Sequence, residues 1–170
     1  MSLKNKTAAV VGIGSLGTVA ADLLASRGIG KLVVIDRDVV ESGNLERQPF
    51  FGQEDIGKPK AMQAKKKLVE MHANVVVVSH AVDLNHKNLE LLNADIIIGC
   101  ADNIETRQLI NEYCLKHKKT WIHSAAIRDV GEVAVFSPEK PCYRCLFGHP
   151  KINESCDTEG ISLETSLVVA

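Results

Sequence analysis

The sequence predicts a Rossmann-like α/β domain, in which a mostly parallel sheet is covered by helices on both faces in three αβα layers. Short apolar runs rich in β-branched residues alternate with segments of helical periodicity, and turn residues separate them. Such runs are typical of strands buried on both faces, and their alternation with helices favours a parallel sheet. A glycine-rich loop directly after the first run is a second observation that predicts this fold.

The first apolar run, AAVVGI at residues 8–13, predicts a strand that leads into the loop. Residues 15–26 are expected to form a helix that ends at Gly28 and Gly30, because apolar residues recur there at helical spacing, namely Leu16, Val19, Ala20, Leu23 and Leu24. Further strands are predicted at residues 32–35, 75–78, 96–99, 120–124 and 132–136, and further helices at residues 58–72, 88–92 and 105–117.

Length and composition indicate one globular domain over residues 1–170. The net charge of −1 implies no general attraction to nucleic acid or membranes, and no apolar run reaches the ~20 residues of a spanning helix. The N-terminus lacks a signal-peptide core, so we expect a cytoplasmic protein whose cysteines are thiols, ligands or nucleophiles. The chain stops on the apolar stretch ISLETSLVVA, which indicates that the C-terminal part of the domain is incomplete.

The glycine loop, GIGSLG, matches the G-x-G-x-x-G pattern between a strand and a helix. Gly12 suits the tight turn, Gly14 lets the backbone approach a phosphate, and Gly17 lets the helix pack on the strand. Asp36 lies 19 residues after Gly17, where a carboxylate can bind ribose hydroxyls. The pattern favours an adenine nucleotide but does not separate NAD from ATP, and a loop that only packs is the plain alternative.

The segment after Asp36 is unusual for an NAD-binding protein, because residues 37–57 contain no apolar helical pattern. A triphosphate needs cationic side chains, which Arg47 and Lys60 can supply. Asn44 can bind a phosphate or the attacking acyl group. Asp102, after the strand at residues 96–99, lies at the carboxyl edge of the sheet, where a carboxylate can hold Mg²⁺ on the triphosphate. The alternatives are that Arg47, Lys60 and lysines 65–67 are surface charges and that Asp102-Asn103 caps a helix.

Together these motifs resemble the ThiF/MoeB/HesA family, the bacterial and archaeal relatives of the adenylation domain of ubiquitin-activating enzymes. The resemblance covers residues 7–160 and rests on GIGSLG, DRDVV followed by NLERQ, GKPK, CADN, SAAIRDVGEVAVF and PCYRC. It implies an adenylyltransferase that uses ATP and Mg²⁺, with a homodimer as its assembly. The implied nucleotide-binding residues are Gly12, Gly14, Gly17, Asp36, Asp38, Asn44, Arg47, Gln48, Lys60 and Asp102, and of these Arg47, Lys60 and Asp102 are implied to be catalytic.

The resemblance also implies the reaction and the partner. The family adenylates the C-terminal glycine carboxylate of a small β-grasp carrier protein that ends in Gly-Gly, which gives an acyl-adenylate and pyrophosphate. Cations and backbone N–H groups would reduce the repulsion between carboxylate and triphosphate. Family members carry a leading helical segment and a further C-terminal part that are not visible here, so the chain is expected to be truncated at both ends.

The cysteines are expected to play different roles. Cys142 and Cys145 form a C-x-x-C pair, which suggests half of a tetrahedral zinc site. The resemblance implies a second C-x-x-C beyond the end of this chain, while His149 with Cys156, or a redox role, are alternatives. Cys156 matches the position where many relatives carry an acyl- or sulfur-accepting cysteine. Cys114 lies on the apolar stripe of a helix and Cys100 ends a strand, so both are expected to pack.

Other residues and two other functions stay open. His72, His117 and His123 are expected to be structural, and Arg128 either contacts the incoming tail or lies on the surface. An NAD-dependent oxidoreductase would use GIGSLG and Asp36 but leaves NLERQ and GKPK unexplained. A non-catalytic adaptor with the family fold would not need Arg47, Lys60 and Asp102.

Overall fold

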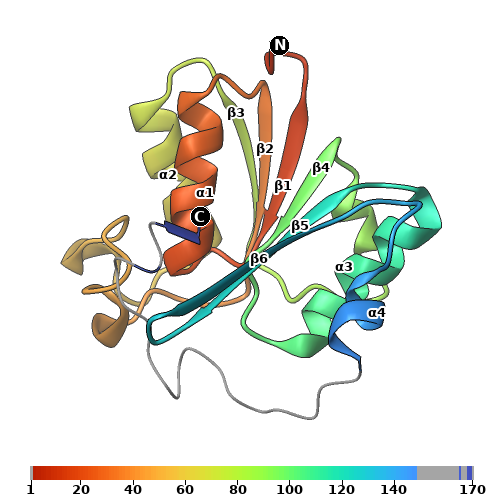
Figure 1. Cartoon of the computed structure of the whole chain (residues 1–170). Coiled ribbons are helices and arrows are strands. Elements are labelled where there is room, and N and C mark those ends of the chain that lie inside the picture. The colour runs from red at the N-terminus through yellow and green to blue at the C-terminus, as the bar shows by residue number, and fades with distance from the viewer. Residues whose placement is uncertain (1, 149–164, 166–167, 170) are drawn as a thin grey trace.

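The computed structural model describes residues 2–148, 165 and 168–169, and in this part of the chain six strands form one sheet (Figure 1). The strands are β1 (Thr7–Val11), β2 (Lys31–Ile35), β3 (Val76–His80), β4 (Ile96–Gly99), β5 (Trp121–Ile127) and β6 (Val130–Phe136). Their order in the sheet is β3-β2-β1-β4-β5-β6. The neighbours from β3 to β5 pair in parallel, and β6 pairs with β5 antiparallel. This order is that of a Rossmann sheet with an antiparallel edge strand. The sequence predicted the mostly parallel sheet but not the strand order or the antiparallel edge.

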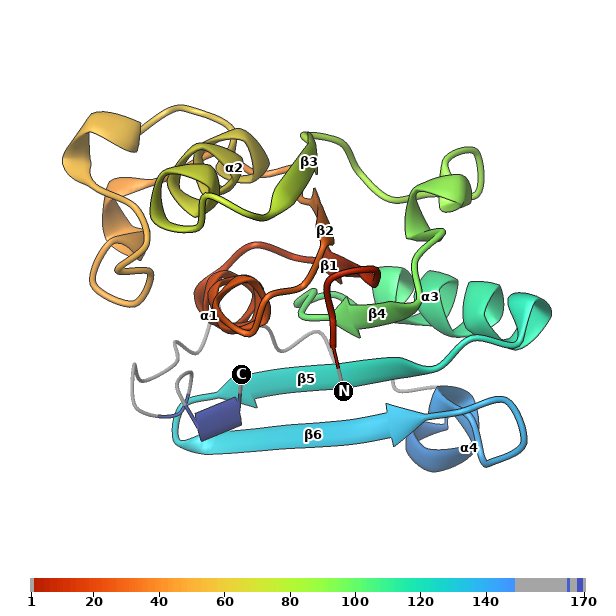
Figure 2. The ribbon, with the colours of Figure 1, turned by 90° about the horizontal axis from the view of Figure 1, so that it is seen from above.

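The helices cover both faces of the sheet (Figure 2). One face carries α1 (Ser15–Ser26) and α2 (Lys60–Met71), and the other carries α3 (Ile104–His117) and the short α4 (Tyr143–Phe147). Single 3₁₀ turns lie between them at η1 (Ser42–Asn44), η2 (Gln53–Asp55) and η3 (Leu89–Leu92). Among the described residues the longest helix, α3, has 14 residues, and no helix is long and apolar enough to cross a bilayer.

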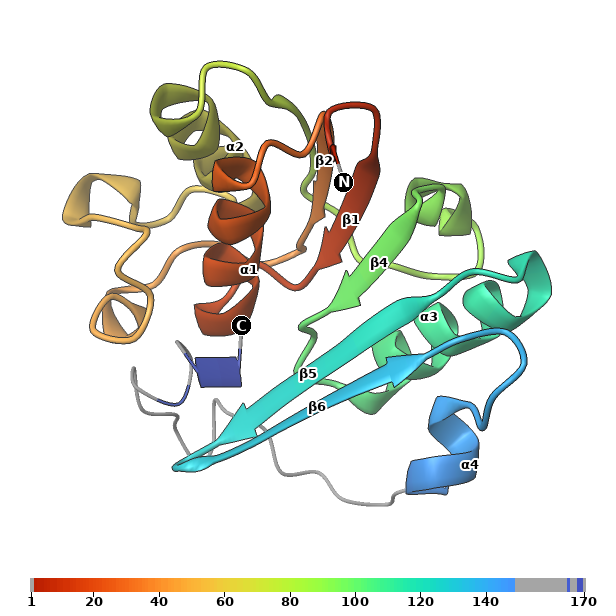
Figure 3. The ribbon, with the colours of Figure 1, turned by 45° about the horizontal axis from the view of Figure 1, so that its top comes forward.

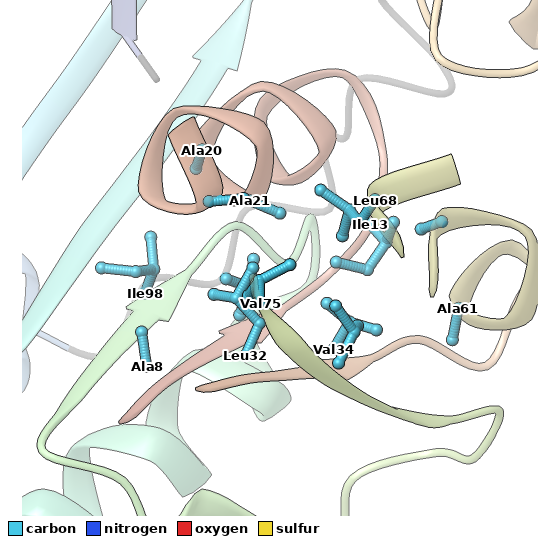
Figure 4. Packing of buried hydrophobic residues seen from close by; sticks show 14 of the residues in the cluster. Ala8, Ile13, Ala20, Ala21, Leu32, Val34, Ala61, Leu68, Val75 and Ile98 are labelled. Carbon is cyan, nitrogen blue, oxygen red and sulfur yellow. The ribbon is translucent and has the colours of Figure 1, made fainter. Parts of the chain in front are cut away.

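Two apolar cores lie on the two faces of the sheet, because alternate residues of each strand point in opposite directions. Ala8 and Val10 of β1 pack against α1 and α2, where Ala20, Ala21 and Leu68 are buried (Figure 4). The neighbouring residues of β1 pack on the other face with Ile110, Tyr113 and Cys114 of α3. Burial on both faces explains the continuous apolar runs in the sequence. The prediction that Cys114 lies in a core is confirmed, since it is 2% exposed.

The elements differ from the sequence-based expectation at several boundaries. β1 ends at Val11, because Gly12 has a positive φ of 88° and turns the chain. The helix expected at residues 88–92 is only the 3₁₀ turn η3. Strands β5 and β6 are longer than expected and form a hairpin, and α4 was not predicted because its five residues show no helical periodicity. Leu23 of α1, expected on the apolar face, is 45% exposed.

The parallel strands bring their carboxyl ends to one edge of the sheet (Figure 3). The ribbon of β1 leads into α1, β4 ends beside that turn, and the longer β5 runs past it. The chain segments that leave β1, β2 and β4 therefore lie close to the last residues of β5, although they are far apart in the sequence. In open α/β sheets this edge is where ligands bind.

Candidate functional site

A cleft lies at this edge of the sheet, and most of the predicted site residues line it. It is bounded by the glycine loop, by the segments that follow β2, β3 and β4, and by the end of the β5–β6 hairpin. The predicted residues on its wall are Gly12, Gly14, Asp36, Asp38, Arg47, Gln48, Lys60 and Asp102. Residues on the wall that sequence reasoning did not single out for this site include Ser15, Arg37, Arg107, Ser124 and Glu132.

The three glycines of the loop each meet a separate geometric requirement. A Cβ atom on Gly12 would lie 2.7 Å from the carbonyl carbon and oxygen of Cys100, and its positive φ favours glycine as well. A Cβ atom on Gly17 would lie 1.8 Å from the Gly12 carbonyl oxygen, so only glycine lets α1 pack this closely on β1. Gly14 instead opens on the cleft, where its nearest neighbour would be Gln48 Nε2 at 3.8 Å.

The N-terminus of α1 faces the same cleft. Gly14 is its N-cap, Ser15 and Leu16 line the wall, and the first turn carries no acidic residue. The first N–H groups of a helix lack helical partners and carry partial positive charge. This end of α1 is therefore suited to bind an anion such as a phosphate.

Asp36 follows β2 and is held by the backbone on both sides. Its Oδ2 accepts a hydrogen bond from the Ile13 N–H at 2.5 Å, and its Oδ1 accepts one from the Asp38 N–H at 2.7 Å. Burial raises the pKa of Asp36 above its ordinary value, against the opposing effect of these two N–H donors. Each carboxylate oxygen has a second lone pair, so the group can still accept hydrogen bonds from a ligand in the cleft.

The segment after Asp36 folds back toward the glycine loop and brings basic side chains to the cleft. Lys60, the first residue of α2, is 7% exposed, and its Nζ lies 3.6 Å from Asp38 Oδ2. Its main-chain N–H donates to the Asp38 carbonyl at 2.9 Å, which ties the start of α2 to the end of β2. Arg47 and Gln48 reach the same wall from the irregular segment. The alternative that Lys60 is a surface charge is therefore wrong.

Asn44 lies behind the cleft wall and orients Gln48. The Gln48 Nε2 group donates to Asn44 Oδ1 at 2.9 Å, and Asn44 Nδ2 donates to Glu41 Oε2 at 3.3 Å. Gln48 is 3% exposed, and within the described residues its Oε1 has no hydrogen-bond partner. A buried acceptor without a partner costs free energy, and the Gln48 Nε2 atom lies nearer to Gly14, 3.8 Å from the position of a Cβ atom there.

Lys67 anchors the irregular segment to α2, although the sequence suggested a surface charge. Its Nζ lies 2.9 Å from Asp55 Oδ2, and the same oxygen accepts from the Gly52 N–H at 2.9 Å. Burial raises the pKa of Asp55, but the Gly52 hydrogen bond and Lys67 outweigh it, and the pKa lies below its ordinary value. Lysines 65 and 66 are exposed, as expected.

Asp102 follows β4 and lines the cleft. Arg107 lines it too, although the sequence analysis did not identify this cationic residue. Asn103, and not Asp102, caps α3, since Asn103 Oδ1 accepts from the Thr106 N–H at 2.8 Å. Arg107, in the first turns of α3, donates from Nε to the Ala101 carbonyl at 3.0 Å and also lines the cleft. Arg107 lies four residues, about one helical turn, after the N-cap Asn103, and this spacing could have located it in the sequence.

Cys100, which follows β4, also lines the cleft, together with Ser124 of β5 and Glu132 of β6. The Cys100 and Ser124 side chains are 3.2 Å apart, and Ser124 Oγ donates to the Gly99 carbonyl at 3.3 Å. Burial raises the pKa of Cys100 to about 11, so this thiol is protonated at neutral pH and is not an activated nucleophile. His123 is fully buried, and its Nε2 lies 2.8 Å from Glu132 Oε1.

The predicted zinc ligands Cys142 and Cys145 do not line the cleft. The Sγ atoms of Cys142 and Cys145 are 3.2 Å apart at the start of α4. Burial raises the pKa of Cys142, but hydrogen bonds from Cys145 and from backbone N–H groups outweigh it, and the pKa lies below its ordinary value. Among the described residues no group of three or more His, Cys, Asp and Glu side chains could hold a metal ion. Cys156 and His149 lie outside the described residues.

Three further residues from the sequence analysis, namely His72, His117 and Arg128, also lie outside the cleft wall. His72 Nε2 lies 2.6 Å from Asp22 Oδ1, and the His117 ring stacks on Tyr113, so both contact structural neighbours as expected. Arg128 has a positive φ of 53° and lies in the turn between β5 and β6, outside the cleft wall.

The ThiF family model matches residues 1–170 of this chain. The chain belongs to the ThiF family. It is 35% identical over 174 residues to the sulfur carrier protein ThiS adenylyltransferase of Bacillus subtilis, an alignment that covers 99% of this chain and 52% of the relative. It is 37% identical over 156 residues to the sulfur carrier protein adenylyltransferase of Thermus thermophilus, with 87% and 58% covered.

Solved structures show the same fold as this ThiF-family chain. Its fold matches the crystal structure of E. coli MccB with ATP at a TM-score of 0.84 and 26% identity, covering 99% of this chain and 53% of MccB. The Rossmann-like prediction is therefore confirmed. The chain spans about a third to somewhat more than half of the curated relatives it matches, from 35% to 58% of their length.

Proposed function

We propose that this chain is the nucleotide-binding part of an adenylyltransferase that activates the C-terminal glycine carboxylate of a small β-grasp carrier protein ending in Gly-Gly. The observation that carries the proposal is the convergence of Lys60, Arg47 and Gln48 on the same cleft as the glycine loop and Asp102. A dinucleotide would need the glycine loop and Asp36 alone, whereas a triphosphate also needs cations. The relatives named above are themselves adenylyltransferases of sulfur carrier proteins.

In this proposal ATP occupies the part of the cleft that follows β1 and β2. Its phosphates bind at Gly14 and the N-terminus of α1, and its ribose hydroxyls donate to Asp36. Arg47 and Lys60 neutralise phosphate oxygens, and Asp38 holds the Lys60 ammonium in place at 3.6 Å. Gln48 contributes a polar side chain to the same wall of the nucleotide site.

Asp102 is proposed to hold the Mg²⁺ ion of the nucleotide. Its carboxylate lines the cleft after β4, and carboxylate oxygen is the ligand that Mg²⁺ prefers. Only one such group is needed from the protein, because Mg²⁺ keeps several waters and phosphate oxygens as its other ligands. When bound, the ion would withdraw charge from the triphosphate.

The reaction follows from these charges. A carboxylate oxygen of the carrier attacks the α-phosphorus, the new O–P bond forms, and the bond from the α-phosphorus to the bridging oxygen breaks, so that pyrophosphate leaves. No general base is required, since a C-terminal carboxylate is ionised at pH 7. The cationic residues lower the barrier by stabilising the charge that builds on the phosphate oxygens.

The proposal extends to features outside the cleft. Cys142 and Cys145 are two of the four ligands of a structural zinc ion, with the others outside the described residues. Their Sγ atoms are 3.2 Å apart, close enough for both to bind one ion. Cys156 attacks the acyl-adenylate, so that a thioester forms and AMP leaves, or it carries a persulfide from a sulfur-donor protein whose outer sulfur displaces AMP from the acyl group. The full-length protein is a cytoplasmic homodimer, and the free thiols of the four described cysteines are consistent with a reducing compartment.

Carrier-dependent exchange of labelled pyrophosphate into ATP tests the proposed function. Replacing Lys60 with Met should lower the exchange rate roughly 100-fold or more, because a cation aimed at the phosphates is lost. The matched control is Lys58→Met, an exposed lysine two residues earlier that should change the rate less than about twofold. Exchange that needs no carrier, or that survives Lys60→Met, would contradict the proposal.

A further inference from the structure

Glu132 and His123 form a pair at the cleft that the proposed chemistry does not use. His123 lies on β5 with no exposed surface, and the rings of Trp121, Tyr143 and Phe147 surround it. Its Nε2 lies 2.8 Å from Glu132 Oε1, on the neighbouring strand β6. A histidine fully enclosed by aromatic rings cannot turn to another partner, so it fixes the position of the Glu132 carboxylate.

The charge state of the pair follows from its surroundings. Burial lowers the pKa of His123 below its ordinary value, against the opposing effect of the Glu132 hydrogen bond. A neutral imidazole beside a carboxylate donates from Nε2–H. The Glu132 side chain remains 47% exposed and lines the cleft. Glu132 Oε1 therefore accepts a hydrogen bond from His123, while Glu132 Oε2 is available to a ligand in the cleft.

The place of Glu132 in the sheet separates it from the nucleotide part of the cleft. Strand β4 lies between β1 and β5 in the sheet, so Asp102 stands between the glycine loop and the β5–β6 wall. ATP fills the first part in the proposed function. The second substrate must then approach the α-phosphorus along the other part, past Glu132.

The wall on that side is built from small side chains. Ser124, Ala125 and Ala126 line the cleft, and their side chains are small, so a bound chain can lie with its main chain close to this wall. An extended segment of glycines fits such a wall. Its main-chain N–H groups then need acceptors, and a carboxylate is the strongest acceptor that a side chain offers.

We propose that Glu132, positioned by His123, selects the acyl substrate by accepting a hydrogen bond from a main-chain N–H within the last two residues of its glycine tail. The inference rests on the proposed function and goes beyond it, since it assigns a specificity-determining residue.

Exchange kinetics on the full-length protein test the role of Glu132. Glu132→Ala should raise the KM for the carrier roughly tenfold, since one hydrogen bond to a charged group is lost, while the KM for ATP changes less than about twofold. Glu132→Gln, which keeps an acceptor oxygen, should recover part of the loss. Glu139→Ala, an exposed acid after β6 and outside the cleft wall, is the matched control and should leave both constants unchanged.

A carrier with a methylated tail nitrogen identifies the contact itself. Sarcosine in place of each of the last two glycines removes one N–H at a time, and at one position it should weaken the wild-type reaction about tenfold yet hardly affect Glu132→Ala. Additive losses, or equal changes in both KM values, would overturn the inference while carrier-dependent exchange by the wild type leaves the proposed function standing. Absence of that exchange in the wild type would overturn both.

Discussion

At the residue scale, the described cysteines differ in reactivity because their surroundings differ. Burial raises the pKa of Cys100 to about 11 and that of Cys114 to about 12, so neither thiolate forms at neutral pH. Cys142 lies at the start of α4 with a pKa below its ordinary value. A cysteine nucleophile for the activated acyl group is therefore neither Cys100 nor Cys114, and Cys156, which lies outside the described residues, is the proposed candidate.

Alkylation tests this difference directly. In protein treated with a chelator, iodoacetamide at about pH 7.5 should label Cys142 first, because the thiolate is the reactive form. Cys100 and Cys114 should stay unlabelled until denaturant is added, as followed by peptide mass spectrometry. Zinc added before the reagent should protect both Cys142 and Cys145 and leave the other thiols unchanged. Rapid labelling of Cys100 in the folded protein would contradict the argument.

Some residues of the cleft could be located from the sequence, and others could not. Asp36 and Asp102 could be located because each lies within three residues of the end of a strand, and parallel strands end at one edge. Asn44 could not, because the path of an irregular segment depends on hydrogen bonds such as the one from Gln48 to Asn44. Glu132 was missed since its neighbour His123 comes from another strand.

At the scale of elements, the segment between β2 and α2 is held by a few specific contacts. The Lys60 N–H donates to the Asp38 carbonyl, and the Val40 N–H donates to the Lys58 carbonyl, so both ends of the segment are joined. The middle is tied to α2 by Lys67 and Asp55 at 2.9 Å. An irregular segment can thus present Arg47 in a fixed place without helix or strand.

Replacing Lys67 with Gln should destabilise the protein by about 1–3 kcal/mol, because buried Asp55 loses its charged partner. The effect should depend on pH, since the pKa of Asp55 is below its ordinary value of 3.8 and that of Lys67 is above its ordinary 10.5. The pair therefore stabilises the fold fully between these values, and its contribution is lost as pH falls below 3.8 through the Asp55 pKa.

Urea unfolding of Lys67→Gln and of the exposed control Lys66→Gln measures this contribution. The control should unfold within about 0.5 kcal/mol of the wild type at every pH. The difference between the two variants should be constant from about pH 5 to 9 and should shrink in acid. A deficit that persists in full below the Asp55 pKa would show that Lys67 acts through packing instead.

The contact of α1 with β1 is a second test at this scale. Gly17→Ala places a Cβ atom 1.8 Å from the Gly12 carbonyl oxygen, so α1 must move away from the sheet. We expect a loss of about 3 kcal/mol or more in unfolding free energy, together with weaker ATP binding. Gly43→Ala, where a Cβ atom meets nothing within 4 Å, should change stability by less than about 0.5 kcal/mol. Similar losses in both variants would refute the packing role.

At the scale of the whole molecule, the sequence predicted the sheet and its two helical layers correctly, because burial on both faces leaves a strong apolar pattern. It did not predict that β5 and β6 form a long hairpin, since the turn at Arg128 has no glycine and takes a positive φ of 53°. Nor did it predict α4, whose Tyr143 is held in the core beside Trp121 by tertiary contacts alone. An element that is held by contacts with residues far away in the sequence shows little pattern in its own residues.

Because the cleft is assembled from the ends of β1, β2, β4 and β5, a ligand that fills it should stabilise the whole fold. At a concentration of 100 times its Kd, ATP with Mg²⁺ should add about 2.7 kcal/mol, which raises Tm by roughly 5–10 °C for a chain of this size. NAD should give a much smaller shift, because it leaves Arg47 and Lys60 without a phosphate partner. Thermal melts of the wild type and of Lys60→Met with each ligand compare the two. A larger shift with NAD, unaffected by Lys60→Met, would favour a dinucleotide site over an adenylating one.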